Sequence, residues 1–309
     1  MITPFWQMDV MFIETVIILP IYIILLVDIS ICQFSKTHFQ SQYYVLVVSQ
    51  GIADILTSLF VLQLFFARYF QFGNEFIFAA QMYGSAIFHS DSGPFFFVIR
   101  YFGVFLITLQ RYLAVCRSHG RFYQIFSRLS NFQLILIHWL GSILIFSPSF
   151  FTIFPTPPYF SNSTELFLVN SAFHVQFFSA IVIFVFVFFG IINLLMYIQV
   201  IRAIIKAKKV SGLQQNKNNS SQETRLLIHI FLLVLISSLT FLYYFNEFIA
   251  SGQSSYSEAR RFHRRFYAII AVNFGYINPI VLLFLNRDVR MRIGRATKVW
   301  DKRTSMVSK

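Results

Sequence analysis

Long apolar runs alternate with short polar segments along most of the chain. A helix needs about 20 apolar residues to cross a bilayer, and seven runs come close to that length. They predict helices at about Met11–Ile31, Tyr43–Phe66, Ala86–Cys116, Phe132–Ile153, Val175–Ile201, Leu226–Ile249 and Phe266–Leu285. The pattern therefore predicts an all-α membrane protein, with residues 1–309 forming a single seven-transmembrane helix bundle.

The third predicted helix contains a polar insert, HSDSGP, at His89–Pro94. Polar backbone and a Gly-Pro break are tolerated at membrane depth only where protein or water surrounds them. The pattern leaves open whether residues 75–93 form a loop or the outer part of the third helix.

Composition agrees with a membrane protein, because 57% of the residues are hydrophobic and only 12% are charged. The crossings use most of the length, so we expect no separate soluble domain. Cys32 and Cys116 both fall at predicted cytoplasmic helix ends, which predicts no extracellular disulfide. The start of the chain lacks a basic region before the first apolar run, so we expect that run to remain as a crossing rather than be cleaved.

Basic residues set the predicted orientation. They gather in the segments at 32–42, 117–131, 202–225 and 286–309, whereas the alternate segments hold only Arg68 and the RRFHRR cluster at 260–265. The positive-inside rule therefore predicts an outer N-terminus, a cytoplasmic C-terminus and a basic cytoplasmic tail over 286–309.

Two polar segments are consistent with that orientation. Asn162 heads an Asn-Ser-Thr glycosylation triplet in a predicted outer loop. Asn218 and Asn219 head similar triplets, but KKVSGLQQNKNNSSQETR is predicted to be a flexible cytoplasmic linker.

Several local motifs point to a receptor family. They resemble elements of rhodopsin-like G-protein-coupled receptors and follow one another in the expected order. GIADIL at 51–56 resembles "LAxAD", Gln110-Arg111-Tyr112 resembles "DRY", and Asn278-Pro279 resembles the start of "NPxxY". Trp139 with Pro148 resembles the Trp and Pro of the fourth helix, and LNRDVR at 285–290 resembles the short amphipathic helix that follows the seventh. The resemblance implies a seven-helix receptor that couples to a heterotrimeric G protein.

Departures from these motifs narrow the family. Gln110 replaces the acid of "DRY", no proline interrupts the sixth helix, and the outer third-helix cysteine is missing. With its high phenylalanine content, the chain resembles nematode serpentine chemoreceptors of the Srg superfamily, within it the Srv type. That resemblance implies a small-molecule ligand and a place in the plasma membrane of chemosensory neurons.

Two ionisable residues are predicted at mid-membrane, Asp54 and Arg100. An unpaired charge there is expensive, so each is a candidate functional residue. Arg100 precedes Arg111 by eleven residues (111 − 100), which is a rotation of about 20° from the same face and a rise of about 16 Å.

In rhodopsin-like receptors the second-helix acid helps to bind sodium. We expect the Arg100 guanidinium to replace that ion and pair with Asp54, with Asn278 as a possible third member. The alternative is that Arg100 binds an anionic ligand.

Arg111 lies near the predicted inner boundary, where an arginine can simply extend to the headgroups. The resemblance instead implies an activation switch formed by Gln110, Arg111 and Tyr112, with Tyr197 as a partner and Asn278-Pro279 on the seventh helix.

Polar residues at the predicted outer helix ends are candidate ligand contacts: His89, Ser90, Asp91, Ser92, His174, Tyr243, Tyr244, Asn246 and Glu247. They are set among aromatic residues, so we expect an aromatic pocket with a few orienting polar groups. The predicted seventh helix contains no lysine, which excludes a retinal Schiff base there.

Other function classes fit less well. The chain has no HExxH, GxSxG or phosphate-loop pattern, so we expect no enzyme, no cofactor and no metal site. A ligand-gated channel or small transporter with Asp54 and Arg100 along its pathway stays open. The net charge of +13 lies along a predicted membrane surface, which favours G-protein or anionic-lipid contact over nucleic acid.

Overall fold

A computed structural model describes residues 6–34, 41–152, 155–164, 166, 168–210, 217–251 and 266–285. Within these residues, six helices are long and apolar enough to cross a membrane, and Ile269–Leu283 is a shorter apolar helix. The predicted fold class, a seven-transmembrane helix bundle, is confirmed. The predicted orientation of the termini stays a prediction, as does the basic tail at 286–309, which lies outside the described residues.

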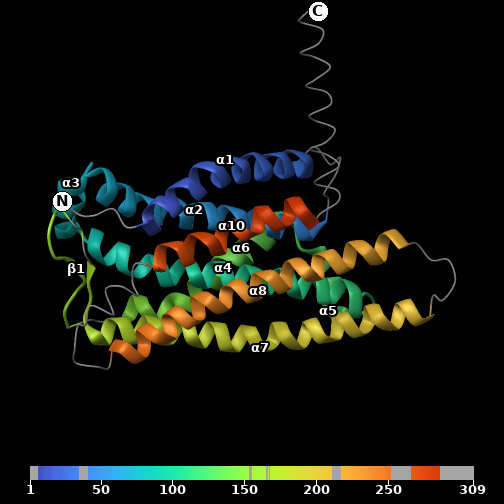
Figure 1. The fold of residues 1–309 in the computed structure, drawn as a ribbon. Coiled ribbons are helices and arrows are strands. Elements are labelled where there is room, and N and C mark those ends of the chain that lie inside the picture. The colour runs from blue at the N-terminus through green and yellow to red at the C-terminus, as the bar shows by residue number, and fades with distance from the viewer. Residues whose placement is uncertain are drawn as a thin grey trace, which may run out of the picture.

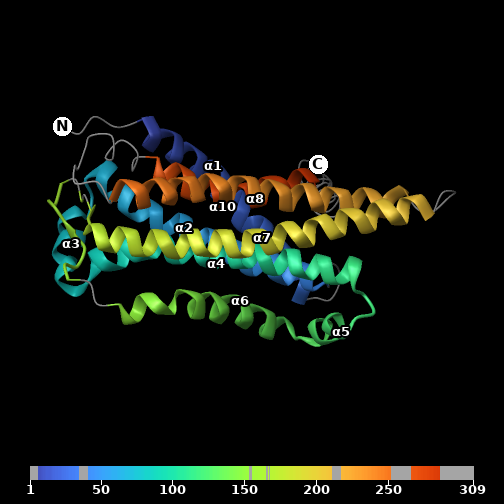
Figure 2. The same cartoon turned by 90° about the horizontal axis from the view of Figure 1, so that it is seen from below.

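The long helices lie side by side along one direction (Figures 1 and 2). They are α1 (Trp6–Phe34), α2 (Gln42–Phe70), α4 (Ser85–Cys116), α6 (Asn131–Phe146), α7 (Ala172–Val210), α8 (Lys217–Ser251) and α10 (Tyr267–Leu285). Helix α4 packs against α2, α6, α7 and α8, so it is the central element of the bundle.

Short elements mark the two ends of the bundle. One end, the hairpin end, carries α3 (Asn74–Ala79), the 3₁₀ turns η1 (Ala80–Tyr83) and η2 (Ser147–Phe151), and a hairpin of β1 (Tyr159–Phe160) with β2 (Leu168–Val169). The other end, the α5 end, carries α5 (Arg121–Arg128) (Figure 2). Asn162 is exposed in the loop between β1 and β2.

Helix α4 runs without a break through the polar insert at 89–94, so residues 85–93 are helical and do not form a loop. Polar side chains in the insert bond to carbonyls of the same helix: Ser92 Oγ donates to His89 O (3.2 Å), and His89 Nδ1 lies 2.8 Å from Ser85 O. These bonds satisfy polar groups locally and lower the cost of burying them.

The predicted linker between the fifth and sixth crossings is wrong over much of its length. Helix α7 continues to Val210 and α8 begins at Lys217, and residues 211–216 lie outside the described residues. Lys, Gln and Glu are good helix formers, so helices continue past the last apolar residue. The helices therefore extend beyond the apolar runs from which they were predicted.

The fourth crossing changes from α-helix to a 3₁₀ turn near its end, and its candidate membrane span runs from Asn131 to Phe151. Helix α6 stops at Phe146 and gives way to η2, with Pro148 at its start. Ser130 caps the other end of α6 through a capping box with Gln133. The predicted end at Ile153 lies outside the described residues.

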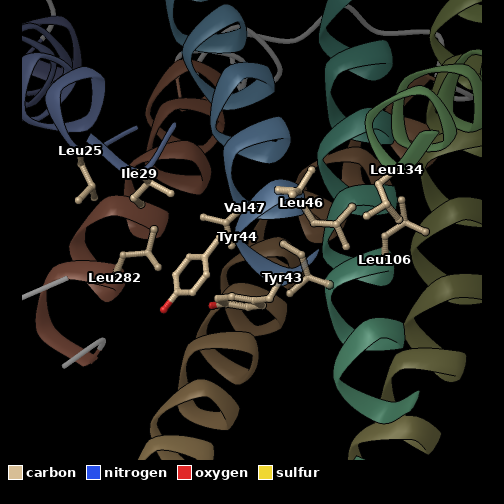
Figure 3. Close-up of a cluster of buried hydrophobic side chains, with 11 residues drawn as sticks. Leu25, Ile29, Tyr43, Tyr44, Leu46, Val47, Leu106, Leu134 and Leu282 are labelled. Carbon is tan, nitrogen blue, oxygen red and sulfur yellow. The ribbon is translucent and has the colours of Figure 1, made fainter. Parts of the chain in front are cut away.

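The apolar core near the α5 end joins five helices (Figure 3). Leu106 and Leu134 meet between α4 and α6. Leu25, Ile29 and Leu282 gather where α1 approaches α10, with Tyr43 and Tyr44 of α2 between the two groups.

Close helix contacts depend on small residues. A Cβ at Gly103 of α4 would clash with Gln50 Oε1 and lie 2.7 Å from His138 Nε2, so a larger residue would require both side chains to move. His138 bonds to Ser49 Oγ (2.7 Å) and Ile99 O (2.9 Å), as expected for a satisfied buried histidine.

Candidate functional site

A fully buried ion pair links α2 and α4 in the middle of the bundle. Arg100 Nε lies 2.8 Å from Asp54 Oδ1, and the two side chains are 2% and 1% exposed. Arg100 on α4 and Asp54 on α2 therefore face each other inside the bundle. Because water does not reach these two charges, other groups of the protein have to stabilise them.

The carboxylate of Asp54 accepts three further hydrogen bonds. Tyr22 Oη of α1 donates to Oδ2 (2.8 Å), Asn278 Nδ2 of α10 donates to the same oxygen, and Gln50 Nε2 donates to Oδ1 (3.3 Å). Donors from α1, α2, α4 and α10 therefore meet at one acceptor. The arrangement stabilises the charged form and ties four helices together.

The guanidinium of Arg100 is also enclosed. Its Nη1 donates to Ala271 O of α10 (2.8 Å), and its plane lies over the Phe274 ring, 4.0 Å from the ring centre. A Cβ at Gly275 would approach Nη2 to 3.1 Å. Helix α10 thus provides three things for this cation: the carbonyl of Ala271, the aromatic face of Phe274 and the space left by the missing side chain of Gly275. Arg100 does not line the cavity described below, which disfavours the anion-binding alternative.

A cavity of about 210 Å³ opens near the hairpin end, between α2, α4, α7 and α8. Most of the predicted ligand residues line it: His89, Ser90, Ser92, His174, Tyr243, Tyr244 and Glu247. Apolar side chains fill most of the remaining wall, including Phe60, Phe65, Phe96 and Phe178. An apolar cavity with a few polar groups is the usual form of a small-molecule site.

Two of the predicted ligand residues lie elsewhere. Asn246 is exposed and does not line the cavity, so its prediction as a contact is not supported. Asp91 is not in the wall, but its Oδ1 lies 2.9 Å from His174 Nε2 and so orients a residue that is.

The cavity is connected to the ion pair by ring contacts. Tyr244 in the wall lies 6.0 Å from Phe97 between ring centres, Phe97 lies 6.1 Å from Phe274, and Phe274 covers the guanidinium of Arg100. Phe97 also stacks on Tyr101 at 5.6 Å. These ring contacts form a continuous series from the cavity wall to the ion pair.

Arg111 lies near the α5 end and stacks on Tyr43, with its guanidinium carbon 3.9 Å from the ring centre. The predicted partner Tyr197 is not among its described contacts. Gln110 is buried, and the hydroxyl of Tyr112 accepts from Arg117 Nε (3.3 Å). Among the residues that the structure describes, the contact found for this arginine is with a fully buried aromatic ring.

A comparison with family models now decides the class of protein. The model described as serpentine type 7TM GPCR chemoreceptor Srv matches residues 11–299, which is nearly the whole chain. The chain belongs to the Srv family. No curated protein matches it.

Membership of the Srv family makes the chain a multi-pass membrane receptor of a chemosensory class.

Sequence reasoning missed several site residues of this Srv receptor. Tyr22 and Gln50 look like ordinary members of apolar helices, and Arg68 and Asn170 look like loop-end residues. Helical phase relative to Asp54 would have found Gln50, which precedes it by one turn. No local signal marks Tyr22, because its partner is distant in sequence.

Proposed function

We propose that this Srv receptor lies in the plasma membrane of chemosensory neurons, binds a small molecule in the cavity and activates a heterotrimeric G protein. The observation that carries the proposal is the aromatic cavity at the hairpin end, opposite the end where Arg117, Arg121 and Arg128 gather. A basic cytoplasmic end fits the positive-inside rule. The cavity then opens outward.

The proposed signal begins at Tyr243 and Tyr244, which α8 contributes to the cavity wall. The ring contacts from Tyr244 through Phe97 and Phe274 lead to Arg100. Spatial continuity alone is no proof of coupling, so the energetic link has to be measured. At the α5 end, we propose that Arg111 is released from Tyr43 and that the G protein recognises this change.

The test is a signalling assay in cells that express the full chain, with odorants supplied from outside. An active odorant should raise a second-messenger response that disappears when the G protein is blocked. Tyr244→Ala should lower the response to that odorant at equal surface expression. Asn246→Ala is the matched control, because it is on the same helix and exposed.

A current that is gated by the odorant and persists without G proteins would overturn the proposal and favour a channel. The dense bonding around Asp54 and Arg100 argues against that alternative, because an ion pathway needs groups that the ion can reach.

A further inference from the structure

His89 offers the cavity a hydrogen-bond acceptor. Its Nδ1 lies 2.8 Å from the carbonyl oxygen of Ser85. A carbonyl can only accept, so the ring proton lies on Nδ1, and Nε2 of the neutral ring carries a lone pair. Nε2 is buried and has no hydrogen-bond partner among the residues that the structure describes. The ring itself is part of the cavity wall.

The surroundings of His89 hold the ring in place. Phe60 lies 4.9 Å away between ring centres, Phe160 lies 5.9 Å away, and Phe88 lies 6.0 Å away. With the Nδ1 bond, these contacts fix the imidazole without the use of Nε2. A buried acceptor without a partner is costly, and a donor that enters the cavity would remove that cost.

A second acceptor lies on the same wall. Asn170 Nδ2 donates to Ser90 Oγ (2.9 Å), which leaves Asn170 Oδ1 as the remaining polar atom of that amide. Oδ1 is buried and lacks a partner within the described part of the chain. The two buried atoms that lack a partner, His89 Nε2 and Asn170 Oδ1, are therefore both hydrogen-bond acceptors.

Formal charge in the wall favours a neutral ligand. Arg68 of α2 and Glu247 of α8 both line the cavity and carry opposite charges. His174 is held by Asp91, so any charge on its ring is balanced by that carboxylate. An ionised ligand would add an unbalanced charge to an apolar cavity, which is unfavourable.

We propose that the cavity is selective for neutral, mostly apolar molecules that carry a hydroxyl group, and that His89 Nε2 accepts the hydroxyl hydrogen. Aromatic side chains pack the apolar body of the ligand, and analogues that cannot donate a hydrogen bond bind more weakly. This inference rests on the proposed function, because it takes the same cavity as the ligand site.

The experiment compares matched probes on the purified full chain in lipid nanodiscs. Each set has one apolar group (hexyl, octyl, benzyl or cyclohexylmethyl) and carries an alcohol, a methyl ether, an aldehyde or a primary amine. Binding is measured as a rise in unfolding temperature, which needs no G protein. We expect at least one alcohol to bind about tenfold or more tightly than its ether and aldehyde, because only the alcohol fills the acceptor.

Variants assign that preference to His89. His89→Phe keeps an aromatic ring and removes the acceptor, so the alcohol should lose its advantage while the ether still binds. His89→Gln keeps a polar atom near Nε2 and should retain part of the preference. His119→Phe, an exposed histidine beyond α4, is the matched control and should change nothing.

Equal binding of alcohol and ether, tightest binding of the amine, an alcohol preference that survives in His89→Phe, or no binding in any set would each overturn the inference. The proposed function fails separately. Alcohols that stabilise the receptor without a G-protein signal would refute signalling alone, and signals from aldehydes as strong as those from alcohols would refute the hydroxyl preference alone.

Discussion

At the scale of single residues, the ion pair between Asp54 and Arg100 is the most constrained feature of the receptor. Its charges are enclosed by Tyr22, Asn278 and the Phe274 ring, so neither can recover hydration if its partner is lost. Removal of one partner from such a pair leaves an uncompensated buried charge, with a loss of about 3–5 kcal/mol.

We therefore expect Asp54→Ala and Arg100→Ala each to lower the unfolding temperature and the amount of receptor at the cell surface. The exchange Asp54→Arg with Arg100→Asp should recover part of the loss, because the charges still match. Recovery should be incomplete, since Tyr22 and Asn278 would then direct donors at a guanidinium. Thermal unfolding of purified protein measures each step.

Arg128→Ala is the control for these variants, because it removes an exposed arginine. Single variants as stable as the parent, or an exchange with no recovery at all, would contradict the pairing as a source of stability.

Helical phase could predict that Arg100 faces the bundle, because eleven residues bring it back to nearly the face of Arg111. It could not predict Tyr22 or the Ala271 carbonyl, which reach the pair only through the packing of α1 and α10. The Arg111 contact was missed for a related reason. Tyr43 is at the start of α2, far from Arg111 in sequence, and the motif alone suggested a different tyrosine.

At the scale of elements, hydrophobic runs predicted both ends of α4 and α10 to within one residue, but not the polar ends of α7 and α8. Helices α7 and α8 extend into polar sequence because helix propensity and membrane burial are separate properties. The cavity was predicted as a group of polar residues at helix ends. Its actual wall needed the convergence of four helices and the β2 hairpin, which brings Leu168 and Asn170 to α4.

Helix α5 is a short amphipathic element with one apolar face, and only part of that face packs against the bundle. Phe126 packs against the core near the α5 end, while Phe122 and Ile125 are 78% and 63% exposed. Arg121 and Arg128 lie beside the exposed pair on the helix surface. Basic and apolar side chains together are typical of a helix that lies in a membrane interface.

We expect Phe122 to enter the headgroup region of the inner leaflet. In Phe122→Trp, lipids with brominated chains should quench the added tryptophan fluorescence. Gln124→Trp is the matched control, because two residues turn the helix by about 200° and place that side chain on the opposite face. Equal quenching of the two variants would show that α5 is not inserted, and its exposed face would then be free for the G protein.

At the scale of the whole molecule, the proposed function depends on which end of the bundle faces outward. The cavity and Asn162 belong to the hairpin end, and the linker triplets at Asn218 and Asn219 belong to the start of α8, near the α5 end. Glycosylation occurs only on the outer side, so the two groups of triplets report opposite orientations.

We expect the receptor from animal cells to carry a glycan at Asn162 alone. Glycosidase treatment should increase the gel mobility of the parent and of Asn218→Gln with Asn219→Gln, and should have no effect on Asn162→Gln. An epitope inserted at 211–216 gives an independent measurement, because an antibody should reach it only after the cells are made permeable. Antibody binding to intact cells would show that the bundle has the opposite orientation. The cavity would then face the cytoplasm, and the chain could not detect external odorants through it.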